Sequence, residues 1–77
     1  MTGPAERAHP LLAPAVADRL RRLRLERNLT QTELGLSIGV SGRTVRALES
    51  GRYTPSVSLA CRVARALDQS VEAVFQP

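Results

Sequence analysis

The sequence predicts a small all-α domain, compact and built from five helices. Apolar residues recur three and four positions apart, which is the spacing that gathers side chains on one side of a helix. A serine or threonine stands before each of the last four segments, where its side-chain oxygen can accept a hydrogen bond from a free helix amide. Because the chain has only 77 residues, it has room for one core and one domain.

Before these segments, residues 1–13 contain prolines and a glycine without helical spacing and predict a flexible N-terminal arm. The domain is therefore expected over residues 14–77. Its first helix should begin at Pro14, since proline suits the first helical turn. It should end near Arg27, before an asparagine that tolerates a left-handed backbone. The buried stripe of this helix is expected to contain Val16, Leu20 and Leu23.

The second and third helices are predicted over residues 31–38 and 42–50. Thr30 and Glu33 have the spacing of a capping box, in which each side chain binds the other residue's backbone amide. The turn over residues 39–41 begins with a glycine and ends with a serine cap. Two short helices joined by such a turn form a helix-turn-helix unit, whose second helix can enter the major groove of DNA.

Two further helices are predicted after Ser56 and Ser70, which are their caps. Cys61, in the fourth helix, is expected to be a small buried apolar side chain. The apolar sets of the two helices are Val57, Leu59, Ala60, Val63, Ala64 and Leu67, followed by Val71, Val74 and Phe75.

Composition narrows the classes of function. The 11 basic residues, all arginine, outnumber the 7 acidic residues and favour a polyanionic partner such as nucleic acid or a membrane surface. One Tyr, one Phe and no Trp disfavour proteins that stack single-stranded bases on aromatic side chains. Neither a transmembrane run nor a signal peptide is recognisable, so a cytoplasmic protein without membrane association is expected.

Nothing in the sequence predicts an enzyme. His9 is the only histidine and lies in the expected arm, the single cysteine has no companion ligand, and the acidic residues are scattered. Because catalytic and metal sites gather such groups, we expect no catalytic residue, no metal and no cofactor.

Helix 42–50 is expected to face inward with Val45 and Leu48, which leaves the intervening residues on the outside or the flank. An arginine near the start of such a helix can bond guanine O6 and N7 together, and an alanine methyl suits the methyl of thymine. Such arginines can also be merely solvated, but the preceding turn and the arginine excess favour contact with double-stranded DNA. The expected base contacts are Gly42, Arg43, Thr44, Arg46 and Ala47.

Contacts to the DNA backbone are expected on either side of this helix. Gln31 opens helix 31–38, where free amides and the helix dipole attract an anion. The residues after helix 42–50 offer a guanidinium, a phenol and a hydroxyl, which are groups that position a protein on phosphates. The expected phosphate contacts are Gln31, Ser41, Arg52, Tyr53 and Thr54.

An ion pair is also expected. Arg24 lies four residues after Leu20, at the edge of the first buried stripe. Glu49 lies four residues after Val45, on the inner side of the third helix. We expect the two charges to meet, partly buried, and to hold the third helix against the first.

These motifs resemble the Cro/lambda-repressor-like, or XRE-type, helix-turn-helix regulators. The resemblance implies the five-helix fold of that family, DNA binding through helix 42–50, and dimers on palindromic operators. It places the family's base contacts, phosphate contacts and ion pair on the residues named above. The matching stretches are 23–24, 27–31, 33–34, 38–41, 47–51, 55–57, 64, 66–67, 70–72 and 74–75.

The sequence departs from the family pattern at several positions. Gly42 stands where many relatives carry a long polar side chain, so one base contact is expected to be missing. Gly35 replaces a usual alanine and costs about 1 kcal/mol of helix propensity, unless it allows closer packing against the third helix. Leu36 takes a place that is usually polar and exposed.

The sequence therefore predicts a sequence-specific, double-stranded-DNA-binding transcriptional regulator, a repressor that acts as a homodimer. Self-association is expected through the last helix, Phe75 and the arm. The alternative is a module that binds a partner protein, such as an antitoxin or an adaptor.

Overall fold

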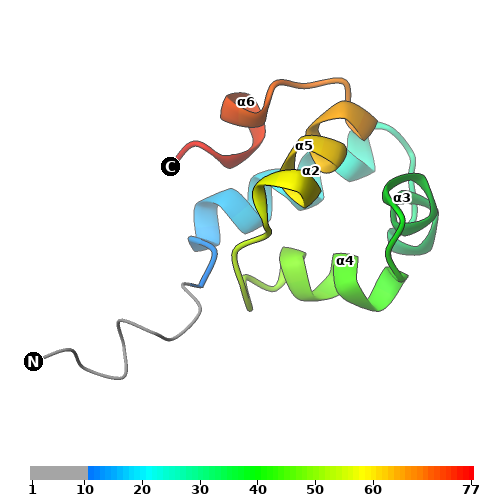
Figure 1. Cartoon of the computed structure of the whole chain (residues 1–77), viewed down its shortest axis with the longest axis horizontal. Helices are drawn as coiled ribbons and strands as arrows, with labels where there is room; N and C mark the ends of the chain where they lie inside the picture. The colour runs from blue at the N-terminus through cyan, green and yellow to red at the C-terminus, as the bar shows by residue number, and fades with distance from the viewer. Residues whose placement is uncertain (1–10) are drawn as a thin grey trace, which may run out of the picture.

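The computed structural model describes residues 11–77, which form helices and connecting turns with no strand in that range. In Figure 1, α4 runs along the bottom of the molecule, α3 stands at one end of it, and α5 and α6 lie above. The elements are α2 (Pro14–Glu26), α3 (Gln31–Ile38), α4 (Gly42–Glu49), α5 (Val57–Ala66) and α6 (Val71–Phe75).

The predicted caps fix the ends of these helices. The hydroxyl of Thr30 accepts a hydrogen bond from the amide of Glu33 at 3.0 Å, and the Glu33 carboxylate accepts one from the amide of Thr30 at 2.8 Å. α2 ends before Asn28, which has a φ of 58°. The remaining caps each accept a hydrogen bond from an amide in the first helical turn and are Ser41, Ser56 and Ser70.

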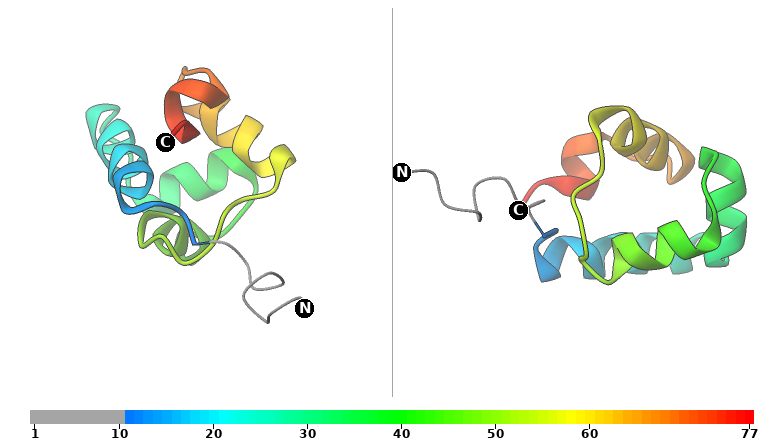
Figure 2. Two further views of the ribbon diagram at one scale, coloured as in Figure 1. Left: turned by 90° about the vertical axis from the view of Figure 1, so that its left-hand side faces the viewer. Right: turned by 60° about the horizontal axis from the view of Figure 1, so that its bottom comes forward.

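One core joins all five helices of residues 11–77. The two views of Figure 2 show how these helices are arranged. α2 contributes Leu20, which is fully buried, and α4 contributes Val45. Burial of this apolar surface is the main favourable term for a domain of this size. The other buried members of the cluster are Leu34, Ile38, Leu48, Leu59, Val63, Ala64, Leu67 and Val74.

The outer side of α5 differs from the prediction. Val57 was expected in the buried set but is 82% exposed, because it is the first residue of the helix and precedes the turn that reaches the core. Cys61 was expected to be buried and is exposed. It lies four residues after Val57 and therefore on the same outer side of α5.

The packed structure begins earlier than predicted. Leu12 was assigned to the flexible arm, but its side chain is buried beside Val16, Ala17 and Phe75. Its amide donates a hydrogen bond to the carbonyl oxygen of Gly51 at 3.2 Å. Residues 1–10 of the expected arm, which include His9, lie outside the described residues. None of the helices described over residues 11–77 has the length and apolar character needed to cross a membrane.

Candidate DNA-binding surface

The turn between α3 and α4 is held by close backbone packing. Gly39 ends α3 with a φ of 80°, a left-handed conformation that glycine adopts without strain. The amide of Val40 donates to the carbonyl of Gly35 at 2.9 Å. A Cβ at position 35 would lie 2.6 Å from the Val40 carbonyl oxygen and 2.9 Å from the carbonyl carbon of Ser41. Gly35 therefore lets the turn itself approach α3.

Arginines gather on the outer face of α4. Arg43 and Arg46 are exposed, as expected, while Ala47 is half-buried between them. Together with Ser50 and Arg52 they line a shallow hollow of about 220 Å³. None of the residues lining this hollow is acidic. The surface can therefore hold an anion against several guanidinium groups at once.

The first turn of α4 uses its hydroxyls for capping. The hydroxyl of Ser41 accepts from the amide of Thr44 at 3.1 Å and is hydrogen-bonded to the Thr44 hydroxyl at 3.2 Å. Gly42 is half-exposed, and its position differs from the prediction. A Cβ there would meet the Thr32 hydroxyl at 2.8 Å, so position 42 is turned toward α3 rather than directly outward.

The inner face of α4 carries the ion pair between Arg24 and Glu49, which is present as expected. The Nε and Nη2 atoms of Arg24 donate to the two carboxylate oxygens of Glu49, at 2.6 and 3.0 Å. The side chains are 8% and 3% exposed, respectively. The hydrogen bond and charge of Glu49 raise the pKa of Arg24, and this outweighs the lowering caused by burial.

One further donor of Arg24 binds a neighbouring segment. Nη1 of Arg24 donates to the carbonyl of Leu29 at 2.6 Å, so the guanidinium also fixes the α2–α3 connection. Within residues 11–77, no buried side-chain polar atom lacks a hydrogen-bond partner. This satisfaction is what makes a buried charge pair tolerable.

Gln31 has a contact that the sequence did not reveal. Its side-chain amide donates to Glu49 at 3.2 Å and so attaches the start of α3 to the ion pair. A side-chain amide in the first turn of a helix can donate to a phosphate or to a carboxylate. Whether Gln31 reaches Glu49 depends on how α3 and α4 cross. Residue spacing within one helix carries no signal for that crossing.

The segment after α4 is anchored at both ends. Gly51 has a φ of 71°, and its carbonyl receives the amide of Leu12. Arg52 is exposed, and its amide donates to the carbonyl of Ala47 at 3.1 Å. Tyr53 packs half-buried against the core, and this burial raises the pKa of its hydroxyl. Of the phosphate contacts predicted in this segment, Arg52 lines the hollow on the arginine face of α4.

Comparison with known proteins decides the family. A helix-turn-helix family model matches residues 20–74, which include all of α3, α4 and α5. The chain belongs to the Cro/lambda-repressor-like helix-turn-helix family. An uncharacterised HTH-type transcriptional regulator of Methanothermobacter thermautotrophicus is 49% identical over 57 residues, covering 73% of this chain and 83% of the relative.

Two solved structures share this fold over most of the chain. The clp gene regulator ClgR of Corynebacterium glutamicum gives a TM-score of 0.76 at 36% identity, covering 87% of this chain and 71% of that one. The P22 c2 repressor, solved with a synthetic operator, gives a TM-score of 0.77 at 23% identity and covers 79% and 92%. At 23% identity, the similarity to the P22 c2 repressor shows the fold alone.

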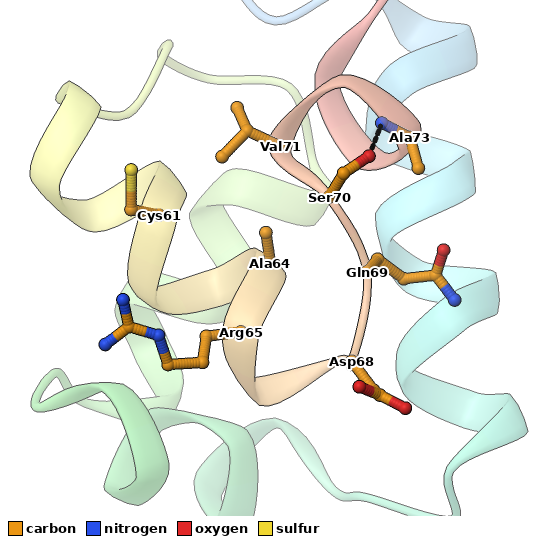
Figure 3. Close-up of a pocket in the computed structure, with 8 residues that line it drawn as sticks. All are labelled: Cys61, Ala64, Arg65, Asp68, Gln69, Ser70, Val71 and Ala73. Atoms are coloured by element: carbon orange, nitrogen blue, oxygen red, sulfur yellow. Dashed lines mark hydrogen bonds between the residues drawn. The ribbon is translucent and has the colours of Figure 1, made fainter.

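Other surfaces of this helix-turn-helix domain have fewer groups suited to binding a polyanion. Figure 3 shows a hollow between α5 and the start of α6, where Ser70 accepts a hydrogen bond from the amide of Ala73 and Cys61 lies at the rim. Among residues 11–77, no group of three or more His, Cys, Asp or Glu side chains could hold a metal ion. The arginine face of α4 is the surface that best fits a polyanion.

Proposed function

We propose that this helix-turn-helix transcriptional regulator recognises a specific duplex sequence and represses transcription by occupying it. One observation carries the proposal. α4 is locked to α2 by a buried ion pair on its inner face, while Arg43 and Arg46 are exposed on its outer face beside Arg52. A rigidly held helix with outward arginines is what readout in the major groove requires.

The two arginines of α4 are the principal base readers in this proposal. In this proposal Arg43, in the first turn, makes a bidentate contact to guanine, and Arg46 contacts a base or a phosphate. Ala47 offers a methyl group, Thr44 keeps a lone pair on its hydroxyl beyond the bond to Ser41, and Gly42 offers backbone only. Sequence readout is therefore concentrated on few side chains.

Backbone contacts would come from both sides of α4. Arg52 supplies the strongest of them, and Tyr53 and Thr54 follow it. Ser41 stands at the start of α4. The side-chain amide of Gln31 donates one hydrogen bond to Glu49. Because a primary amide has two N–H donors, the second can bond a phosphate. These contacts position the protein without reading sequence.

A homodimer on a palindromic operator completes the proposal. A monomer reaches few phosphates, and affinity rises with the number neutralised. Two copies place their α4 helices in successive major grooves about 34 Å apart. α6 and the half-exposed Phe75 are the proposed contact, and the cytoplasm, where DNA is accessible, is the proposed site of action.

Selection of bound duplexes from a random pool tests the proposal. We expect enrichment of a palindromic motif, and an affinity for that motif that falls steeply as salt is raised. Binding that enriches no motif, or that barely changes between low and moderate salt, would contradict it. Retention of a protein partner by a variant with both Arg43 and Arg46 changed to alanine would instead favour an antitoxin or adaptor.

A further inference from the structure

The start of the recognition helix has a gap in its side chains. Gly42 is the first residue of α4 and offers no group to a base. The space that its side chain would take is occupied by Thr32, whose hydroxyl lies 2.8 Å from the position of a Cβ on residue 42. The backbone nitrogen and Cα of Thr32 lie 3.1 Å from the same position.

The Thr32 side chain is exposed and has an uncommitted hydroxyl. Across residues 11–77 this hydroxyl has no hydrogen-bond partner, unlike those of Ser41 and Thr44, which bond each other. The neighbouring Thr30 hydroxyl is likewise committed, because it caps α3. Thr32 is thus a polar group of the first turn of α3 that folding leaves available to a ligand.

Thr32 also lies along the edge of the DNA-reading face. Arg46 follows Gly42 by four residues, so the two share one edge of α4, one turn apart. The Thr32 hydroxyl lies against the Gly42 end of that edge, and the exposed Arg46 continues it. A duplex seated on the arginine face would therefore meet Thr32 where α4 begins.

We propose that Thr32, on α3, supplies the base contact at the start of the recognition helix that Gly42 cannot make. A threonine hydroxyl both donates and accepts, so it can bond the edge of a base in the major groove. The inference rests on the proposed function, because it names a further specificity residue for the same duplex.

Thr32 limits the space for a side chain at position 42. The Cβ of any side chain at position 42 would press on the Thr32 hydroxyl. It would also lie 3.1 Å from the backbone nitrogen and Cα of Thr32. Gly42→Ala should therefore displace the Thr32 hydroxyl and disturb the same base pair as removal of that hydroxyl. Two substitutions on different helices would then change one position of the recognised motif.

Duplex selection with Thr32→Val, which removes the hydroxyl and keeps the branched shape, tests the contact. We expect a folded protein that loses its preference at one base pair per half-site, with a two- to tenfold weaker affinity for the original motif, about the worth of one hydrogen bond. Thr32→Ser should keep the preference. Ser37→Ala, on the same helix but with its hydroxyl bonded to the Glu33 carbonyl, should change nothing.

The outcomes separate this inference from the proposed function. If wild-type protein selects a motif and Thr32→Val selects the identical one, Thr32 reads no base. An equal loss of affinity for all duplexes would mean a phosphate contact and would also overturn the inference. If Gly42→Ala alters a different base pair from Thr32→Val, the shared contact is wrong. Failure of the wild-type protein to select any motif would count against the proposed function itself.

Discussion

The two faces of α4 use the same kind of charge in opposite environments. On the inner face Arg24 of α2 is buried and donates hydrogen bonds to the carboxylate of Glu49 and the carbonyl of Leu29. The side-chain amide of Gln31 donates to the same carboxylate. On the outer face Arg43 and Arg46 are exposed. Buried charges cost stability when left alone, whereas exposed ones are weakly coupled to folding. The inner face thus fixes the orientation of the helix, and the outer face is free to bind.

Removing Glu49 should have the largest effect on stability, because it breaks the buried ion pair on the inner face of α4. The outer face is left unchanged. Glu49→Ala strands the buried Arg24 charge, and we expect a loss of about 3–5 kcal/mol in the free energy of unfolding. Urea denaturation followed by circular dichroism measures it. The matched control is Glu26→Ala, which breaks an exposed pair with Arg22 at 3.6 Å and should cost less than about 1 kcal/mol. Equal midpoints for the two variants would contradict the comparison.

Gly35→Ala tests the close packing of the α3–α4 turn against α3, which holds α4 without charged groups. An alanine gains about 1 kcal/mol of helix propensity, but its Cβ would overlap the Val40 carbonyl oxygen. Because backbone must move, overpacking of about 1–3 kcal/mol should leave the variant less stable than the wild type. Leu36→Ala, at the neighbouring exposed position, is the control. A more stable Gly35→Ala protein would show that the turn has room to shift.

Arg52→Ala tests the outer face without touching the base readers. We expect weaker binding to all duplexes alike and a salt dependence whose slope falls by about 0.9, the loss of one phosphate contact. Fluorescence anisotropy titrations at several salt concentrations measure both. Arg65→Ala, on α5, removes the same charge at another surface and should leave the slope unchanged. A changed base preference in Arg52→Ala would show that Arg52 contacts a base rather than a phosphate.

The smallest expected effect concerns Tyr53, which joins the outer loop to the core. Burial raises its pKa, so the folded protein holds the phenol proton more tightly than the unfolded chain does. The stabilisation is complete below about pH 10, the pKa of a free tyrosine, and is lost as pH rises through the higher folded value. Unfolding curves between pH 8 and 11 should show this decline in wild type and a shallower one in Tyr53→Phe. Parallel declines would mean that the phenol is solvated.

Much of the fold could be predicted because its signals are local. Thr30 and Glu33 announce a capping box within four residues, and each helix carries its own stripe of apolar residues. The pairing of Arg24 with Glu49 was also predictable, since each charge lies one turn beyond a residue of a buried stripe. Such patterns are set within single helices.

What could not be predicted depends on how helices cross. The burial of Leu12, the bond from Gln31 to Glu49, and the approach of Thr32 to Gly42 each join segments whose relative placement no spacing encodes. Cys61 was misplaced for a related reason. Its small apolar character fits a core, but the crossing of α5 turns that side of the helix outward.

The central claim is that the outer face of α4 reads sequence while the inner face holds the helix in place. The ratio of affinities for the selected motif and for an unrelated duplex, measured at one salt concentration, tests it most directly. For a variant with Arg43→Ala and Arg46→Ala, the account predicts a ratio that falls most of the way toward one, with an unfolding free energy close to that of the wild type. A ratio that stays at the wild-type value in that folded variant would contradict it.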